Sequence, residues 1–382
     1  MESEEVTNFI ACVRNDWKIS QEDVPVSQKR DRALGSVIGA LVGDACGAVL
    51  EFHRREITDQ KARDAMKMPG GGSLNVGPGQ ITDDGELTLA LASVLYNKNA
   101  SDFLNFEEGG EGEKIMDEIA KAYSEWYKSE PFDMGQTCGR AFGFANTAAE
   151  MRENALSGYC SEANGQLMRC TPIPVFLSLF HDSPPYKLIA EVARADAMLS
   201  HPSKACQDCA VLYSIAIAHL IHHSNDIKGA IELVESFPGI SEKVRGWLED
   251  SRKPLEEIGS GCRTNIGHVK HAFTLAFHFL RNNIGYEEAI FQTLKFGGDT
   301  DTNCAIVGGL TSITLPSIPF YMVDPVLKFD PVTYDINNKK NGMMGYRRPA
   351  LYRASNILDY FEFHPKTLDR SVENIENTTC LK

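Results

Sequence analysis

Apolar residues recur three and four positions apart along most of this chain, the spacing that places side chains on one face of an α-helix. In residues 114–128, for example, Ile115, Ile119, Tyr123 and Trp126 share one face, and charged residues lie mainly elsewhere. Alternating β-branched runs, which would indicate strands, are few. The sequence therefore predicts an all-α protein, with its clearest helices near residues 33–50, 85–97, 114–128, 186–200, 205–222, 268–281, 286–296 and 302–313.

The domain organisation follows from where this periodicity holds. No linker rich in Pro or Ser divides the middle of the chain, so we expect one domain over residues 30–325. Residues 1–29 read as an N-terminal extension with one short helix and a polar connector. Residues 326–382 read as a C-terminal extension, rich in Asn, Lys and Tyr, that packs on or near the domain.

Composition narrows the classes of function. The chain has 382 residues, of which 43% are hydrophobic, which excludes intrinsic disorder. Its 52 acidic and 38 basic residues give a net charge of -14, so we expect no general binding to nucleic acid or anionic membranes. Acidic residues stand at the N-terminus in place of a secretory signal, and ten scattered cysteines indicate reduced thiols. We expect a monomer in the cytoplasm, with the nucleus left open.

Glycines recur every four residues at positions 35, 39, 43 and 47 inside a helical stretch. Each costs about 1 kcal/mol relative to Ala in a helix interior, so the stripe indicates a close approach by another helix or by a ligand. Asp44 lies beside this stripe, and Glu51 follows seven residues later, two turns further along the predicted helix. Two carboxylates facing one cleft indicate water or cation chemistry.

A Gly- and Pro-rich loop runs into the next helix through Thr82, Asp83 and Asp84. Asp83 with Glu86 fits a capping box, so these acids could do no more than cap the helix. Adjacent acids preceded by Thr exceed what capping needs, however, and hard divalent cations take carboxylate and hydroxyl oxygens. Both interpretations stay open on this motif alone.

A second acidic cluster, in KFGGDTDTNCAIVGGL, repeats this design with Asp299, Asp301 and Thr302 after two glycines at a helix start. Together with Asp83 and Asp84 it supplies four carboxylates, which two divalent ions would neutralise. We therefore predict a binuclear Mg²⁺ or Mn²⁺ site, with zinc disfavoured because neither cluster contains His or Cys.

Three further segments carry weaker signals. Asn164, Gly165 and Arg169 precede two prolines, a bend at which backbone amides could meet phosphate, and Arg169 could equally serve as a structural ion-pair partner. His201 ends a helix before Pro202, where it could cap the helix or contact a ligand. Asp133 is a single acid before Gly135 and by itself says little.

The segments GDACGAVLEF, GPGQITDDGELTLALA, NGQLMRCTPIPVF, LSHPSKACQD and FGGDTDTNCAIVGGL, in this order, resemble the ADP-ribosylglycohydrolases over about residues 32–315. The GGG...PGQ-TDD stretch is most similar to the dinitrogenase reductase activating glycohydrolases of bacteria. The resemblance implies a compact, orthogonal all-α bundle. It also implies two Mg²⁺ or Mn²⁺ ions and removal of ADP-ribose from modified protein side chains, with the arginine linkage preferred.

The resemblance also assigns roles to residues. It implies that Glu51 and Asp133 are catalytic, that Asp84 is both catalytic and a ligand, and that Asn164, Gly165 and His201 line the ADP-ribose cleft. The implied metal ligands are Thr82, Asp83, Asp84, Asp299, Asp301 and Thr302.

The implied reaction is hydrolysis through an oxocarbenium-like transition state, in which Glu51 or Asp133 accepts the proton of water. Gly85 departs from the family pattern TDDT, which we expect to loosen the helix start. Other ADP-ribose conjugates, serine-linked ones included, remain alternatives to arginine, as do a non-catalytic ADP-ribose reader and a structural, crystallin-like protein.

Overall fold

The computed structural model describes residues 26–103, 111–157, 160–313, 318–334 and 345–362. Most of the predicted N-terminal extension therefore lies outside the described residues. Within them the regular structure is helical, apart from two isolated β-bridges, so the predicted all-α class is confirmed. The helices are α2 (Val26–Gly47), α3 (Asp59–Ala65), α4 (Asp83–Leu95), η1 (Ala100–Phe103), α5 (Glu111–Lys128), α6 (Gln136–Phe142), α7 (Ala148–Leu156), α8 (Pro172–Phe180), α9 (Tyr186–Met198), α10 (Lys204–His222), α11 (Ile227–Ser236), α12 (Glu242–Asp250), α13 (Leu255–Gly259), α14 (Val269–Arg281), α15 (Tyr286–Phe296), α16 (Thr300–Thr311), α17 (Phe320–Lys328), η3 (Ala350–Tyr352) and α18 (Asn356–Glu362).

The eight helices predicted from periodicity are all present, and the largest differences concern α2. This helix ends at Gly47, before the predicted end at residue 50, and the chain turns there through a hydrogen bond from Leu50 N to Gly47 O. Phe52 then takes a left-handed conformation with φ of 53°. Glu51 therefore lies in a turn after the helix, and the prediction that it shares a helical face with Asp44 was wrong.

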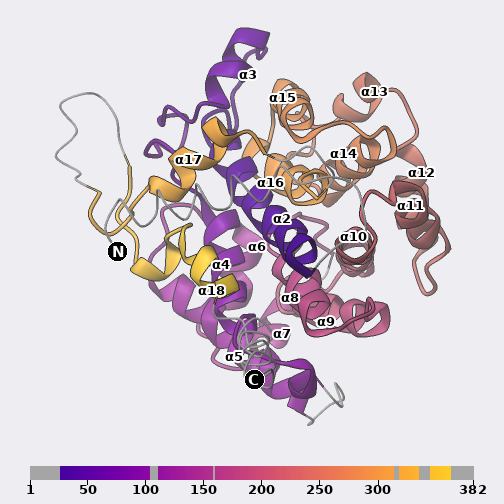
Figure 1. The fold of residues 1–382 in the computed structure, drawn as a ribbon. Coiled ribbons are helices and arrows are strands. Elements are labelled where there is room, and N and C mark those ends of the chain that lie inside the picture. The colour runs from indigo at the N-terminus through magenta and orange to yellow at the C-terminus, as the bar shows by residue number, and fades with distance from the viewer. Residues whose placement is uncertain (1–25, 104–110, 158–159, 314–317, 335–344, 363–382) are drawn as a thin grey trace, which may run out of the picture.

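Helices α2 and α16 lie at the centre of the molecule and pack directly against each other (Figure 1). The glycine stripe of α2 makes this approach possible. A Cβ atom on Gly43 would lie 2.1 Å from Cys304 O, and one on Gly47 would lie 2.3 Å from Thr300 O. The stripe thus serves helix packing, and it holds the start of α16, with Asp299 and Asp301, close to the end of α2.

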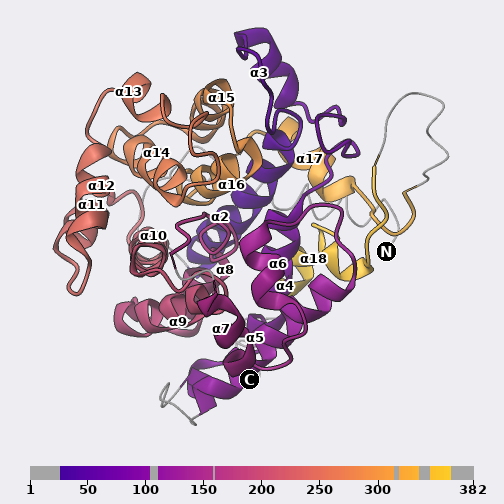
Figure 2. The ribbon, with the colours of Figure 1, turned by 180° about the vertical axis from the view of Figure 1, so that it is seen from behind.

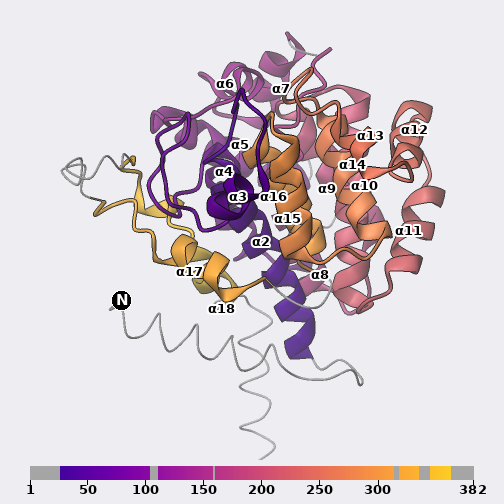
Figure 3. The ribbon, with the colours of Figure 1, turned by 90° about the horizontal axis from the view of Figure 1, so that it is seen from above.

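Many of the remaining helices flank this central pair on two sides. Helices α4, α5 and α18 lie on one side, and α10 to α14 lie on the other, as the two opposite views show (Figures 1 and 2). Seen from above, α17 and α18 lie well away from α11, α12 and α13 (Figure 3). The acidic residues at the starts of α4 and α16 thus come from elements that meet across the centre.

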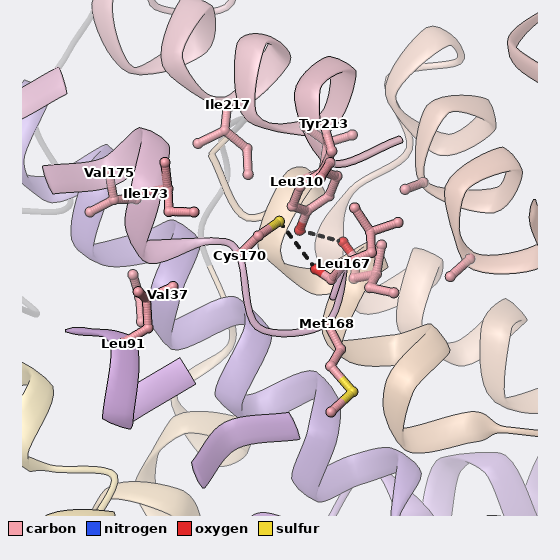
Figure 4. Close-up of a cluster of buried hydrophobic side chains, with 14 of the residues drawn as sticks. Val37, Leu91, Leu167, Met168, Cys170, Ile173, Val175, Tyr213, Ile217 and Leu310 are labelled. Carbon is pink, nitrogen blue, oxygen red and sulfur yellow. Dashed lines mark hydrogen bonds between the residues drawn. The ribbon is translucent and has the colours of Figure 1, made fainter. Parts of the chain in front are cut away.

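The core is continuous around the central pair, and Figure 4 shows the part where α2, α8, α10 and α16 meet. Four side chains there are fully buried, one from each of these helices: Val37, Ile173, Ile217 and Leu310. Helix α10 is the one described helix long and apolar enough to cross a membrane. In this structure 83% of its most apolar window is buried, as in the core helix of a folded domain.

Candidate active site

The two predicted acidic clusters meet in one cleft with a volume of about 420 Å³. None of the described residues that line this cleft is Lys or Arg. Thr82 and Asp84 lie behind the wall, 0% and 1% exposed. The other residues predicted from the sequence line it: Glu51, Asp83, Asp133, Asn164, Gly165, His201, Asp299, Asp301 and Thr302.

Asp44 fixes the loop that carries the first cluster. Its fully buried carboxylate accepts hydrogen bonds from Thr82 N at 2.9 Å, Thr82 Oγ1 at 2.8 Å and Gly85 N at 2.9 Å. A Cβ atom on residue 85 would lie 2.7 Å from Asp44 Oδ2. Gly85 therefore tightens this helix start by admitting the carboxylate, and the expectation that it would loosen the start was wrong.

The capping interpretation of this segment also fails. Helix α4 begins at Asp83 with Thr82 as its N-cap residue, and the Thr82 side chain caps no backbone amide. Glu86 is buried in the first turn of the helix, where it accepts hydrogen bonds from Arg348 and from Trp126 Nε1. The acids of this segment thus have partners, or face the cleft, instead of forming a capping box.

Two groups of buried carboxylates adjoin each other, one in the wall of the cleft and one partly behind it. Asp44, Asp84 and Asp301 each offer an oxygen within 4.8 Å of the others, and Glu51, Asp299 and Asp301 do the same. Asp301 belongs to both groups, so the two are neighbours. Oxygen atoms from several carboxylates at this spacing could hold hard divalent cations.

The second cluster is also held by hydrogen bonds. Asn164 Nδ2 donates to Asp299 Oδ2 at 2.8 Å, and Thr302 Oγ1 lies 3.3 Å from Asp84 Oδ2. Asn164 N donates to Gly267 O at 3.0 Å, which ties the 164–165 bend to the loop before α14. Asn164 thus orients a carboxylate of the candidate metal centre.

Asp83 and Asp133 form a separate pair at the edge of the cleft. Gly135 N donates to Asp83 Oδ2 at 3.2 Å, and burial, followed by the charge of Asp133, raises the pKa of Asp83 well above its ordinary range. The structure thus brings Asp133, which the sequence alone could not place, next to the TDD segment.

Burial and crowding of like charges disfavour ionisation throughout the centre. Burial raises the pKa of Asp44 to about 7. Burial, and then the charges of Asp133 and Asp299, raises the pKa of Glu51 to about 9. The pKa values of Asp84 and Asp301 also lie well above the ordinary range, again first because of burial.

Two oxygens in this centre lack a hydrogen-bond partner among the described residues, Glu51 Oε2 and Asp84 Oδ1. A buried carboxylate oxygen without a donor is costly, and a bound cation removes that cost. One such oxygen belongs to each of the two carboxylate groups. The donor set, the spacing and these two oxygens all fit hard cations.

His201 and Arg169 have different places. A Cβ atom on Gly165 would lie 3.0 Å from His201 Cε1, so the buried imidazole supports the 164–165 bend. Arg169 is fully buried, 3.4 Å from Asp196, and donates to Gly165 O. Arg169 is therefore the structural ion-pair partner that the sequence left as one of two interpretations.

The sequence analysis missed two contributors to this region. The loop before α14 brings Ile266 and Gly267 into the cleft wall, and a Cβ atom on Gly267 would lie 3.3 Å from Asp299 Oδ2. Arg348 reaches Glu86 from the C-terminal part of the chain. The sequence signal for the first is only a glycine, which the structure shows with a positive φ of 81°. The signal for the second is an arginine in an otherwise polar segment.

The fold and the cleft define an all-α protein with a buried carboxylate centre, the kind of centre at which many hydrolases bind divalent ions. Comparison with known proteins gives the family. The sequence model of the ADP-ribosylglycohydrolases matches residues 25–337, which is most of the chain, and the chain therefore belongs to this family.

Individual relatives agree with this assignment. The ADP-ribosyl-[dinitrogen reductase] glycohydrolase of Rhodospirillum rubrum is 29% identical over 289 residues, which cover 74% of this chain and 85% of the relative. The ADP-ribosylarginine hydrolase Tri1 of Serratia proteamaculans is 24% identical over 294 residues, 75% of this chain and 72% of the relative.

A solved ADP-ribosylglycohydrolase-related protein complex contains a chain of the same fold. It has a TM-score of 0.56 and 20% identity, covering 86% of this chain and 99% of that chain. The family assignment makes this protein an enzyme that hydrolyses ADP-ribose from modified targets.

Proposed function

We propose that this enzyme depends on two divalent cations, Mg²⁺ or Mn²⁺, and that it releases ADP-ribose from modified arginine side chains of proteins. The observation that carries the metal dependence is the pair of adjoining carboxylate groups, each with one buried oxygen that lacks a partner among the described residues. The residues that would hold the ions are Thr82, Asp83, Asp84, Asp299, Asp301 and Thr302, with Asp44 and Glu51 beside them. When bound, the ions would supply Lewis-acid stabilisation at the ribose hydroxyls and the attacking water.

The protein's own residues account for the rest of the reaction. The pKa of Glu51, raised to about 9, keeps this side chain protonated near neutral pH in the metal-free protein, and nearby cations would ionise it. Glu51 would then accept a proton from water as the water oxygen bonds to ribose C1″. The bond from C1″ to the guanidinium nitrogen breaks, and that nitrogen leaves with its electron pair and ends protonated. Asn164 keeps Asp299 in place, and the amide of Gly165 is the candidate contact for the diphosphate.

Two observations support arginine as the modified residue. The Serratia relative carries the name ADP-ribosylarginine hydrolase. The cleft edge presents Asp133, and no Lys or Arg lines the cleft in the described part of the chain. A carboxylate accepts paired hydrogen bonds from a guanidinium group, which favours a cationic leaving group at this edge.

The test uses two peptides that carry ADP-ribose on arginine and on serine, each incubated with the purified protein and Mg²⁺. We expect free ADP-ribose from the arginine peptide, and none after EDTA. Release from serine only would overturn the linkage, and release that survives EDTA would overturn the metal dependence. Binding of both peptides without release would make the protein a reader.

A further inference from the structure

Residues 345–352 lie beyond residue 337, where the family match ends, yet they contact the loop before α4 and the turn after α5, which lead into the cleft. Arg348 is 7% exposed and uses both sides of its guanidinium group. Its Nε and Nη2 atoms donate to the two carboxylate oxygens of Glu86 at 2.7 and 2.9 Å. Its Nη1 atom donates to Ser129 O at 2.8 Å and to Glu130 O at 3.3 Å, and Nη2 also donates to Ser129 Oγ at 2.7 Å.

These contacts join the end of one helix to the start of another. Ser129 and Glu130 follow the last residue of α5, where unpaired carbonyl groups favour a cation. Glu86 lies in the first turn of α4, where a negative charge is favoured. Asp133 lies in the loop that follows the end of α5, and Asp83 and Asp84 lie at the start of α4. The Arg348–Glu86 ion pair therefore fixes the spacing between the two sides of the cleft.

Tyr346 makes a second connection closer to the cleft. Its ring stacks on Phe132, the residue before Asp133, with centroids 4.2 Å apart and planes within 5°. Its hydroxyl donates to Leu74 O at 2.9 Å. Its backbone pairs with the Gln80 side chain, because Tyr346 N donates to Gln80 Oε1 and Gln80 Nε2 donates to Tyr346 O. Gln80 lies two residues before Thr82.

The turn that these contacts hold is itself strained. Glu130 has a φ of 54°, a left-handed conformation that is unfavourable for a residue with a side chain. Arg348 donates hydrogen bonds to the carbonyl oxygens of Ser129 and Glu130, the first two residues of this turn. Without these donors the turn would keep the hydrogen bond from Glu130 N to Tyr127 O but would lose its contacts with residues 345–352 at these two carbonyl groups.

We propose that residues 345–352 form a brace that positions Asp133 and the start of α4 for hydrolysis, acting through Phe132, Glu86 and Gln80. The brace residues belong to none of the groups that line the cleft, so they are positioning residues. This inference rests on the proposed function for its catalytic part. The position of the loop itself is measurable without any substrate.

The first test removes the ring of Tyr346 and compares this variant with one that lacks the ring of a second stacked tyrosine, Tyr360. Tyr360 in α18 stacks on Tyr96 with centroids 4.6 Å apart, far along α4 from its acidic start. We expect Tyr346→Ala to lower kcat about tenfold with KM and Mg²⁺ affinity within about twofold, since small misplacements of a catalytic group act on kcat. Tyr360→Ala should leave kcat unchanged, and Tyr346→Phe, which keeps the stack, should restore most of the activity.

The second test follows hydrogen exchange of the peptide over residues 129–135 in the same variants. We expect faster exchange there in Tyr346→Ala and wild-type exchange in Tyr360→Ala. Equal kcat values for the two alanine variants, or unchanged exchange at 129–135, would overturn the brace. If wild-type enzyme releases no ADP-ribose from any peptide, the proposed function fails, and the exchange result alone decides whether the brace exists.

Arg348→Lys gives an independent check, because lysine keeps the charge but cannot span both Glu86 oxygens and the α5 carbonyls. We expect faster exchange at 129–135 and a lower kcat with unchanged Mg²⁺ affinity. If this variant proves too unstable to purify, the pair Tyr346→Ala and Tyr346→Phe still decides the outcome.

Discussion

Asp84 is the residue at which function and stability conflict most directly. Its side chain is 1% exposed, one of its oxygens lacks a partner among the described residues, and Asp83 and Asp44 add like charges. We expect Asp84→Asn to stabilise the metal-free protein by about 1–3 kcal/mol, because it removes a buried charge. The same change should abolish turnover and the stabilisation by Mg²⁺. Thermal unfolding with EDTA and with Mg²⁺ measures both effects.

The matched control for this prediction is Asp64→Asn on α3, whose side chain is 52% exposed in a surface ion pair with Lys67. It should leave the free energy of unfolding almost unchanged and keep the response to Mg²⁺, because exposed ion pairs contribute little to stability. A metal-free Asp84→Asn protein that unfolds below the wild type would contradict the idea that charge crowding weakens this centre.

His201 gives a prediction about pH. Burial, and then Arg169, lowers the pKa of its imidazole from 6.5 to about 3, so the unfolded state binds the proton more readily. Its contribution to stability is therefore complete above pH 6.5 and is lost as the pH falls toward 3. Between pH 7.5 and pH 5 the wild type should lose about 2 kcal/mol more than His201→Gln. Urea unfolding of both proteins checks this, and equal losses would refute it.

Residue by residue, the sequence predicted the parts of the site whose signal is local. Asp83, Asp84, Asp299 and Asp301 stand in short motifs at helix starts, so their chemistry is visible without the fold. The role of Asp44 as the anchor of Thr82 depends on a partner 38 positions away, which periodicity does not reveal.

At the scale of elements, the contact between α2 and α16 gives a test with its control in the same helix. A Cβ atom on Gly43 would lie 2.1 Å from Cys304 O, whereas one on Gly35 would meet its nearest atom, Ser312 O, at an ordinary 3.5 Å. We expect Gly43→Ala to lower the free energy of unfolding by about 1–3 kcal/mol. Gly35→Ala should raise it by up to about 1 kcal/mol, because Ala favours a helix. Denaturant unfolding of the two variants would show opposite shifts, and shifts of the same sign would contradict the packing argument.

Two physical reasons explain why the sequence did not predict some of the helices. Helices α3, α6 and α13 have 7, 7 and 5 residues, too few to show a repeat of 3.6. Helix α8 was hidden by its prolines, but Pro172 occupies the first turn, where a missing N–H is tolerated. Long helices such as α5 and α14 were found because their apolar faces extend over several turns.

At the scale of the whole molecule, the net charge of -14 and the carboxylates of the cleft both repel an anionic ligand. The diphosphate of ADP-ribose is anionic, so the proposed cations must reverse the sign of the local field before it can bind. Like charges brought together cost several kcal/mol, which corresponds to at least about a hundredfold in affinity.

We therefore expect calorimetry to show ADP-ribose binding in Mg²⁺ and a loss of at least about a hundredfold in affinity after exhaustive treatment with EDTA. Adenosine, which lacks the diphosphate, is the matched control, and its weaker binding should change by less than about threefold, because it carries no charge for the carboxylates to repel. Higher salt should partly restore ADP-ribose binding in EDTA, since it screens the exposed part of the repulsion. Tight binding of ADP-ribose to the metal-free protein at low salt would mean that this acidic cleft holds an anion without cations. That result would contradict the argument that cations are needed to offset the repulsion between the cleft carboxylates and the diphosphate.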